Sequence, residues 1–424
     1  MNKLESLVYC TVKNNPRVKN LVRDTYQALF QFLPGPRERS AYPVVKREGY
    51  FFGFHDKNPW SENNLYLLAH GYRGLPNKEP RIGDQVDVGI FHGDDFSLFR
   101  KISTTDCFNW QQGSMLQWLA KSNKFIFNAA GGDNNFAKIF DTNGQAAGVL
   151  PMAIAAVDPQ GEKALSYNFA RLQRHFHGYG YLHGIDPEIE NESPASHGIS
   201  VIDINSNLIT RLFSVRDIAA IHPDKSMSGS VHFLTHCLFS PSGKRFLFLH
   251  RWVKNGNFTF TRMISCDVNG RQLHLFPTHG MVSHIAWQGE SHVLAYSRSM
   301  KDKDAYILFQ DKTDEYRLIG TNDFNSDGHP SFSRSFQNWF ITDTYPDRFH
   351  RSYLILYNIL KEKRSDLGYF RQPLQFKEAV RCDLHPRWNQ DGTMVCFDSA
   401  HSGKRSLCTM DIGNALSTGN IKTI

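Results

Sequence analysis

A short unit that recurs along the second half of the chain constrains its fold more than any other feature. Four times a histidine stands three positions before an aromatic residue, at His236-Cys-Leu-Phe239, His284-Ile-Ala-Trp287, His329-Pro-Ser-Phe332 and His385-Pro-Arg-Trp388. After the aromatic residue come a polar turn and an apolar run, as in Ser240-Pro-Ser-Gly243 before Phe246–Leu249 and Asn389-Gln-Asp-Gly392 before Met394–Phe397. This order predicts a strand that opens at the histidine, a tight turn and a second strand.

Weaker copies of the unit lie upstream. They are Trp60 with Leu65–Leu68, Trp118 with Phe125–Phe127, and Ala156–Gly161 with Ala164–Leu165. The resulting seven copies are separated by roughly 40 to 80 residues, a spacing typical of four-stranded propeller blades with insertions. A content of 32 Phe, 16 Tyr and 7 Trp in 424 residues also favours many short strands over long helices. We therefore predict an all-β, seven-bladed β-propeller.

Residues 16–33 differ from the repeats. Apolar side chains recur there at helical spacing after Pro16 and stop at Pro34, which predicts an amphipathic helix. Its polar face carries Arg17, Lys19 and Arg23, so it would suit peripheral contact with an anionic membrane, while packing against the propeller is the simpler alternative. We assign residues 1–48 to an N-terminal helical extension and residues 49–424 to the propeller.

Charge and cysteine content exclude some classes of protein. The 48 basic and 41 acidic residues are dispersed, so nucleic-acid binding is not predicted, although a mildly positive chain suits an anionic ligand. Seven widely spaced cysteines without a Cys-x-x-Cys motif do not indicate a disulfide framework. With no signal-like apolar stretch at the N-terminus, a cytoplasmic location is expected. The sequence does not constrain the oligomeric state.

The four histidines of the repeat predict a metal site. Repeated units place equivalent residues at equivalent heights, so the imidazoles of His236, His284, His329 and His385 should converge near one mouth of the channel. Imidazole suits transition metals, and the expected absence of a carboxylate cluster beside these histidines argues against Ca or Mg. We expect one divalent transition metal, with Mn or Zn foremost and Cys382 as a lesser ligand candidate. The simpler alternative is that these histidines only pin neighbouring blades together.

A seven-bladed propeller with such histidines around one metal resembles the oligogalacturonate lyases and, more loosely, the propeller-type ulvan lyases. The resemblance covers the architecture of residues 50–415, with local support from Asp327–Ser333, Asp343–Asp347 and Arg381–Trp388. In the oligogalacturonate lyases three histidines and a glutamine hold the metal. Here a fourth histidine takes part instead, and no glutamine stands at a matching position in the last blades.

This resemblance implies a metal-dependent lyase that cleaves uronic-acid-containing oligosaccharides or polysaccharides by β-elimination. A cation beside the sugar carboxylate stabilises the enolate-like charge, and a basic side chain removes the C5 proton. The polar insertion at residues 173–196 is too long for a simple hairpin, and it follows Arg171. We therefore predict Arg171, His175 and Tyr179 as catalytic residues, although a buried ion pair, a solvated imidazole and loop packing are simpler roles for them.

A second group of residues is predicted to bind the acidic sugar at the same mouth, because basic and aromatic side chains suit carboxylates and sugar faces. It comprises His55, Lys57, Arg251, Tyr345 and Arg387. Two alternatives to a lyase stay open. One is a glycoside hydrolase that uses a carboxylate pair from Asp327, Asp343, Asp347 and Asp383. The other is a non-catalytic propeller that binds a glycan or a protein partner.

Overall fold

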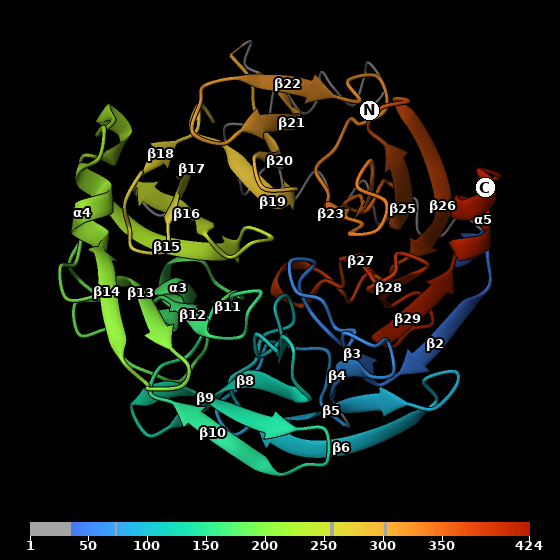
Figure 1. Ribbon diagram of the computed structural model, residues 1–424, viewed down its shortest axis with the longest axis horizontal. Helices are drawn as coiled ribbons and strands as arrows, with labels where there is room; N and C mark the ends of the chain where they lie inside the picture. Colours follow the sequence, from blue (N-terminus) through green and yellow to red (C-terminus); the bar gives the residue numbers. More distant parts are fainter. Residues whose placement is uncertain (1–34, 73, 255–257, 301–302) are drawn as a thin grey trace.

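The computed structural model describes residues 35–72, 74–254, 258–300 and 303–424. Their strands form seven antiparallel sheets arranged in a circle around one axis (Figure 1), which confirms the predicted seven-bladed β-propeller. The helix predicted for residues 16–33, with its possible membrane contact, lies outside the described residues. Within them, no helix has the length and apolar character needed to cross a membrane.

Blades 1 to 4 follow the chain outward from the axis, and each consists of four strands. Blade 1 contains β3 (Tyr50–Phe51), β4 (Leu67–Gly71), β5 (Val86–His92) and β6 (Leu98–Thr105). Blade 2 contains β7 (Gln117–Leu119), β8 (Lys124–Gly131), β9 (Asn134–Asp141) and β10 (Ala146–Leu150). Blade 3 contains β11 (Ala156–Val157), β12 (Lys163–Ser166), β13 (Gly198–Asp203) and β14 (Ile209–Ser214). Blade 4 contains β15 (Ser230–Phe239), β16 (Arg245–Lys254), β17 (Phe258–Asp267) and β18 (His274–Leu275).

Blades 5 to 7 complete the ring. Blade 5 contains β19 (Val282–Gln288), β20 (His292–Arg298), β21 (Asp304–Gln310) and β22 (Tyr316–Ile319). Blade 6 contains β23 (Ser331–Phe332), β24 (Trp339–Asp343), β25 (Arg351–Asn358) and β26 (Lys363–Arg371), and blade 7 contains β27 (Arg387–Trp388), β28 (Met394–Ser399) and β29 (Ser406–Asp411). The connections carry short helices, namely α3 (Phe169–His175), α4 (Val215–Ala220), η1 (Lys225–Met227), η2 (Glu378–Val380) and α5 (Gly413–Thr418).

Two strands from the N-terminal side of the chain complete blades 6 and 7. Strand β2 (Val44–Glu48) pairs antiparallel with β29 and becomes the outer strand of blade 7, while β1 (Glu38–Ser40) pairs with β26 as a fifth strand of blade 6. Both strands fall within the predicted N-terminal extension. The propeller therefore begins before residue 49, and the predicted boundary is corrected accordingly.

In blades 2, 5 and 7 the tryptophan of the repeat forms a hydrogen bond to the preceding blade. The indole nitrogen of Trp118 donates to the carbonyl of Pro59, that of Trp287 to Leu238 and that of Trp388 to Ser331, at 2.8, 3.2 and 2.9 Å. In every case the acceptor stands one residue before the aromatic position of the preceding blade. The blades are therefore held in a common register by the residue that defines the repeat.

The predicted tight turns are present between the first and second strands of blades 4 and 7. Gly243 and Gly392 donate their backbone N–H groups back to Ser240 and Asn389, at 2.9 and 3.3 Å. Both glycines have positive φ, 72° and 74°, which is a conformation that glycine adopts without steric cost. The apolar runs that follow form β16 and β28, whose side chains lie almost wholly in the core between neighbouring blades.

Candidate metal centre

The structure brings the four predicted histidines together around one phenyl ring on the axis. The centroid of the Phe54 ring lies 5.1 Å from that of His236, 5.9 Å from His284, 5.8 Å from His329 and 5.0 Å from His385. The His284 and His329 rings are 3.9 Å apart, and the His329 and His385 rings are 4.2 Å apart. Convergence of the repeat on one spot, as predicted from the sequence, is therefore observed.

The backbone that presents the histidines is irregular. His329 and His385 stand two residues before β23 and β27, whereas His236 and His284 lie inside β15 and β19, where the pairing register shifts. The prediction that all four open a strand is therefore wrong for two of them. A bulge adds one residue to a strand and turns its side chain, which lets a histidine face the axis without ending the strand. His236 and His385 also have positive φ, 56° and 44°.

The remaining blades carry different residues at the same repeat position. Three residues before Trp60, Trp118 and Val157 stand Lys57, Met115 and Ile154. Met115 and Ile154 are buried and apolar, and the Lys57 ammonium is paired with Asp56 at 2.5 Å. The imidazole nitrogens at the repeat position therefore lie on one side of the axis, next to blades 4 to 7.

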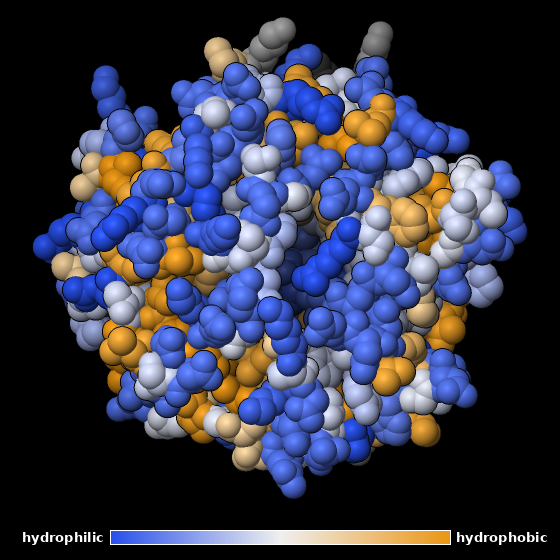
Figure 2. All heavy atoms as spheres, in the orientation of Figure 1, coloured by the Kyte–Doolittle hydropathy of each residue, from blue (hydrophilic) through white to orange (hydrophobic). Residues whose placement is uncertain are grey.

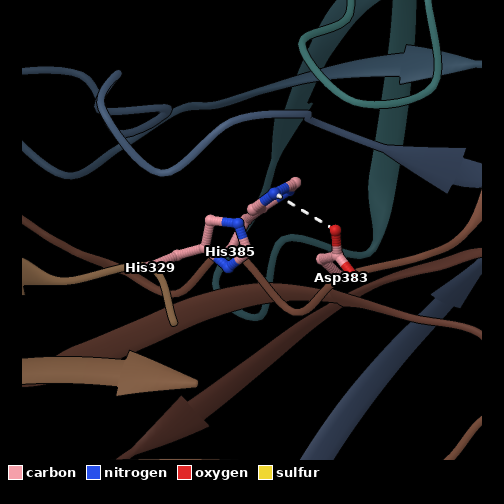
Figure 3. Close-up of side chains that lie close together, drawn as sticks. All are labelled: His329, Asp383 and His385. Carbon is pink, nitrogen blue, oxygen red and sulfur yellow. Dashed lines mark ion pairs between the residues drawn. The ribbon is translucent and has the colours of Figure 1, made fainter. Parts of the chain in front are cut away.

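Three groups on this side are placed to share a cation. Ligand atoms of His329, Asp383 and His385 all lie within 4.8 Å of one another, and Figure 3 shows the two rings and the carboxylate directed toward one another. His329 Nε2, His385 Nε2 and Asp383 Oδ1 are buried and have no hydrogen-bond partner among the described residues. Buried polar atoms are normally paired, so three adjacent exceptions indicate a missing ligand.

These three donors fit a divalent transition metal. Bonds from such ions to imidazole nitrogen and carboxylate oxygen are about 2.1 Å long, so small side-chain rotations would bring atoms at the observed spacing into contact with one ion. Burial lowers the pKa of both His329 and His385 well below the usual range, which keeps the imidazoles neutral and able to coordinate. Nitrogen and oxygen donors together suit Mn, Fe or Zn.

Asp343 orients the two histidine ligands. Its Oδ1 accepts from His329 Nδ1 at 2.7 Å and from the His329 backbone N–H at 2.8 Å, while Oδ2 accepts from the His385 backbone N–H at 3.0 Å. Since His329 Nδ1 donates to the carboxylate, the lone pair is left on Nε2. Carboxylate support of this kind fixes the tautomer and ring orientation of metal-binding histidines. Asp327 supports His284 Nδ1 in the same way at 3.0 Å.

Carboxylates do cluster beside the histidines, so the prediction that they are absent is wrong. Asp327 and Asp383 each stand two residues before a histidine, at His329 and His385, and this Asp-x-His repetition was visible in the sequence. Cys382 is corrected as well. It lies in a small apolar cluster with Phe376 and Ala400, where burial raises its thiol pKa to about 12, and the neighbouring Asp383 faces the histidines instead.

His55, predicted to bind substrate, belongs to the histidine cluster. Its ring centroid lies 5.4 Å from that of His329, and its Nδ1 bonds to the carbonyl of Pro330 at 2.8 Å. A carbonyl only accepts, so Nδ1 carries the proton and the buried, unpartnered Nε2 carries the lone pair. His55 is therefore a further nitrogen donor next to the three-residue group.

The other predicted substrate-binding residues fall into two groups. Arg251 and Tyr345 lie by the cluster, since Tyr345 is 5.8 Å from His329 between ring centroids and Arg251 lies over Phe176 at 4.5 Å. Lys57 and Arg387 are buried ion-pair partners, of Asp56 and Asp398 respectively. Arg387 also donates to the carbonyl of Gly53 at 2.9 Å, so it holds the segment that carries Phe54 and His55.

The three predicted catalytic residues are placed differently from one another. Arg171 is buried and its guanidinium is occupied by Asp186 and by four carbonyls, those of His232, Glu188, Asn191 and Glu192. Its contacts tie the insertion together. His175 lies beside Phe233, 6.2 Å away between ring centroids, and burial lowers its pKa to about 4. Only Tyr179 approaches the histidines, at 6.0 Å from His236 between ring centroids.

Arg381 is a residue of the site that was not predicted. Its Nε donates to Asp383 Oδ2 at 2.5 Å, and its Nη2 donates to the Tyr179 hydroxyl at 2.7 Å. The guanidinium also lies over the Tyr345 ring, 5.5 Å from the ring centroid. Burial lowers its pKa, but Asp383, Tyr179 and Tyr345 together raise it further than burial lowers it, so the guanidinium stays cationic. The sequence signal was an arginine two residues before an acidic ligand in Arg381-Cys-Asp383.

Figure 2 shows a mostly hydrophilic face with a hollow near its centre, around the axis of the ring. Comparison with solved structures shows the fold alone. An oligogalacturonate lyase in complex with manganese aligns at a TM-score of 0.61 and 11% identity, covering 89% of this chain and 98% of that one. An oligogalacturonate lyase from Vibrio parahaemolyticus aligns at 0.59 and 10%, covering 88% and 93%. No protein-family model and no curated protein matches the chain.

Proposed function

We propose that this propeller is a metal-dependent lyase that cleaves uronic-acid-containing oligosaccharides or polysaccharides by β-elimination. The observation that carries the proposal is the set of buried, unpartnered ligand atoms on His329, Asp383 and His385. The fold shared with oligogalacturonate lyases, one of them in complex with manganese, supports the choice of reaction. We propose Mn or Zn as the cofactor, held by these three residues with His55 as a further donor.

The bound metal would supply a positive charge that neutralises the sugar carboxylate and stabilises the charge that develops on it. We assign the remaining steps to protein side chains. Arg251 adds a second positive charge, because burial lowers its pKa only to about 10 and the guanidinium stays protonated at neutral pH. We assign removal of the C5 proton to Tyr179, which would act as the phenolate and thereby become the neutral phenol, since it is the one residue of the predicted catalytic set whose ring lies near the histidines. Arg171 positions the insertion that carries Tyr179.

The proposed substrate is an acidic oligosaccharide. Three features at the site suit its carboxylates and sugar faces, namely Arg251, Arg381 and the ring of Tyr345. The hydrolase alternative is weakened because Asp343 and Asp383 already hold the histidines and Arg381, and are not free as an acid and base pair.

The test is to incubate the purified protein with Mn²⁺ and oligogalacturonate and to follow near-ultraviolet absorbance of an unsaturated product. We expect activity that chelation abolishes, no bound metal in His329→Ala/His385→Ala, and a rate about 100-fold lower in Tyr179→Phe. His292→Ala, on β20 away from the centre, is the matched control and should behave like the unmodified chain.

The product distinguishes the alternatives. New reducing ends without the chromophore would replace the lyase by a hydrolase. A protein that holds no metal and cleaves no uronide would instead be a binding propeller, in which the histidines serve only the structure.

A further inference from the structure

We infer that Arg381 is an exchangeable counter-ion of the metal centre, which neutralises Asp383 in the metal-free protein and turns to the carboxylate of the acidic ligand when a metal takes its place. This inference rests on the metal site of the proposed function. It assigns a positioning and specificity role to a residue outside the ligand set.

Asp383 needs a positive partner. Its side chain is 2% exposed, and a buried carboxylate without compensation is strongly unfavourable. Arg381 supplies the charge through Oδ2, and the same oxygen lies 4.0 Å from His385 Nε2 (Figure 3). Oδ1 is buried and has no hydrogen-bond partner in the described part of the chain. The guanidinium and an ion would therefore draw on the same carboxylate.

A divalent ion and Arg381 compete for this carboxylate. An ion bound to His329, His385 and the Asp383 carboxylate would lie close to the guanidinium that contacts Oδ2 of that carboxylate. Two positive centres so close together repel strongly where water is excluded. Binding of the ion therefore weakens the hold of Arg381 on Asp383.

The guanidinium has contacts other than Asp383. It donates to the Tyr179 hydroxyl and to the carbonyl of Glu378 at 3.3 Å, and it lies over the ring of Tyr345. Its backbone is fixed, because the Arg381 carbonyl accepts from Gln111 and Arg405, each at 3.1 Å. Since the arginine side chain is 22% exposed, a ligand carboxylate can reach it from solvent. Arginine binds carboxylates in a planar, bidentate geometry.

The test is the affinity of the full-length protein for Mn²⁺ alone, measured by electron paramagnetic resonance and calorimetry. Arg381→Gln retains a donor for Asp383 but removes the charge, so we expect Mn²⁺ to bind at least about tenfold more tightly. Arg381→Lys keeps the charge and should stay near the unmodified affinity. Arg381→Met is a second neutral variant, which gives the same reading if Arg381→Gln does not fold.

The chain offers a matched control on an outer strand. Arg364 pairs with Asp366 two residues further on, from Nε to Oδ1 at 2.6 Å, so Arg364→Gln breaks an ion pair of the same kind away from the centre. It should leave Mn²⁺ affinity unchanged. Equal or weaker Mn²⁺ binding by the neutral Arg381 variants would overturn the counter-ion role while leaving the proposed function intact. Absence of Mn²⁺ binding in the unmodified chain would remove both.

A second measurement addresses the ligand. In the unmodified chain we expect Mn²⁺ to raise the affinity for galacturonate, which serves as a small carboxylate probe. In Arg381→Gln the factor by which Mn²⁺ raises this affinity should be at least about tenfold smaller. The same gain in both proteins would show that Arg381 does not turn to the ligand.

Discussion

Among single residues, Asp343 does most to shape the centre. One carboxylate accepts from the imidazole and backbone of His329 and from the backbone of His385, so it fixes two ligands that belong to different blades. It does so without contributing to the group of candidate ligand atoms itself. Its loss would free the His329 ring to rotate and would release the backbone of His385.

We predict that Asp343→Asn weakens Mn²⁺ binding by about 10- to 100-fold, because an amide cannot accept from all three donors as a carboxylate does. Calorimetry with Mn²⁺ measures the change. Asp347→Asn, at the next acidic position of the same segment, is the comparison variant and should have a small effect. Unchanged affinity in Asp343→Asn would mean that the histidines are held by packing alone.

At this scale the sequence predicted that the four histidines converge, since a repeat places equivalent residues at equivalent heights, but only His329 and His385 of the four belong to the group of candidate ligand atoms. It predicted their partners poorly. Asp383 and Arg381 act through contacts that depend on the course of the connection between β26 and β27, which no periodicity encodes. Arg171 was misjudged for a related reason, because only the folded insertion shows that carbonyl oxygens surround its guanidinium.

Among the elements, blade 4 contains a buried chain of hydrogen bonds that is sensitive to acid. Arg262 donates to His250 Nδ1 at 3.0 Å, so the proton of His250 is on Nε2, which bonds to His232 Nδ1 at 2.9 Å. If His232 were protonated at Nδ1, its N–H would face the N–H of His250 Nε2, and neither donor would have an acceptor there. Burial accordingly lowers the pKa of His232 to about 4 from 6.5.

This arrangement predicts that acid destabilises the fold. Between pH 6.5 and about 4 the unfolded chain binds a proton at His232 and the folded chain does not, so the free energy of unfolding falls as pH falls. His232 contributes a loss of about 3 kcal/mol over that range. In urea titrations His232→Gln should show a shallower decline with pH, while His292→Gln should keep the original slope. Equal slopes in all three proteins would refute this assignment.

The elements themselves were largely predictable, because polar turns and aromatic positions mark where each blade begins. The bulges at His236 and His284 were not. A one-residue shift of register leaves no trace in a short alternating pattern, although it decides which way a side chain points.

For the whole molecule, stability depends on how the ring is closed. Strand β2 joins the N-terminal side of the chain to blade 7 through five register pairs with β29, and β1 joins it to blade 6. Without them the outer edge of blade 7 would be unpaired. Closure of this type makes the first and last parts of the chain fold as one unit.

We predict that a chain starting at residue 50 has a melting temperature several degrees lower than a chain starting at residue 35, because it lacks both closing strands. Differential scanning calorimetry of the two proteins measures the difference. The longer protein is the control for loss of residues 1–34. Identical melting temperatures would show that blades 6 and 7 are stable without these strands.

The position of the Phe54 ring has a consequence for how a ligand can move along the axis of the propeller. The ring stands on the axis with four imidazoles packed around it, and its side chain is almost wholly buried. Among the described residues, these packed rings occupy the axis at the level of Phe54. A ligand that entered the central hollow would meet them and would leave through the same face of the propeller.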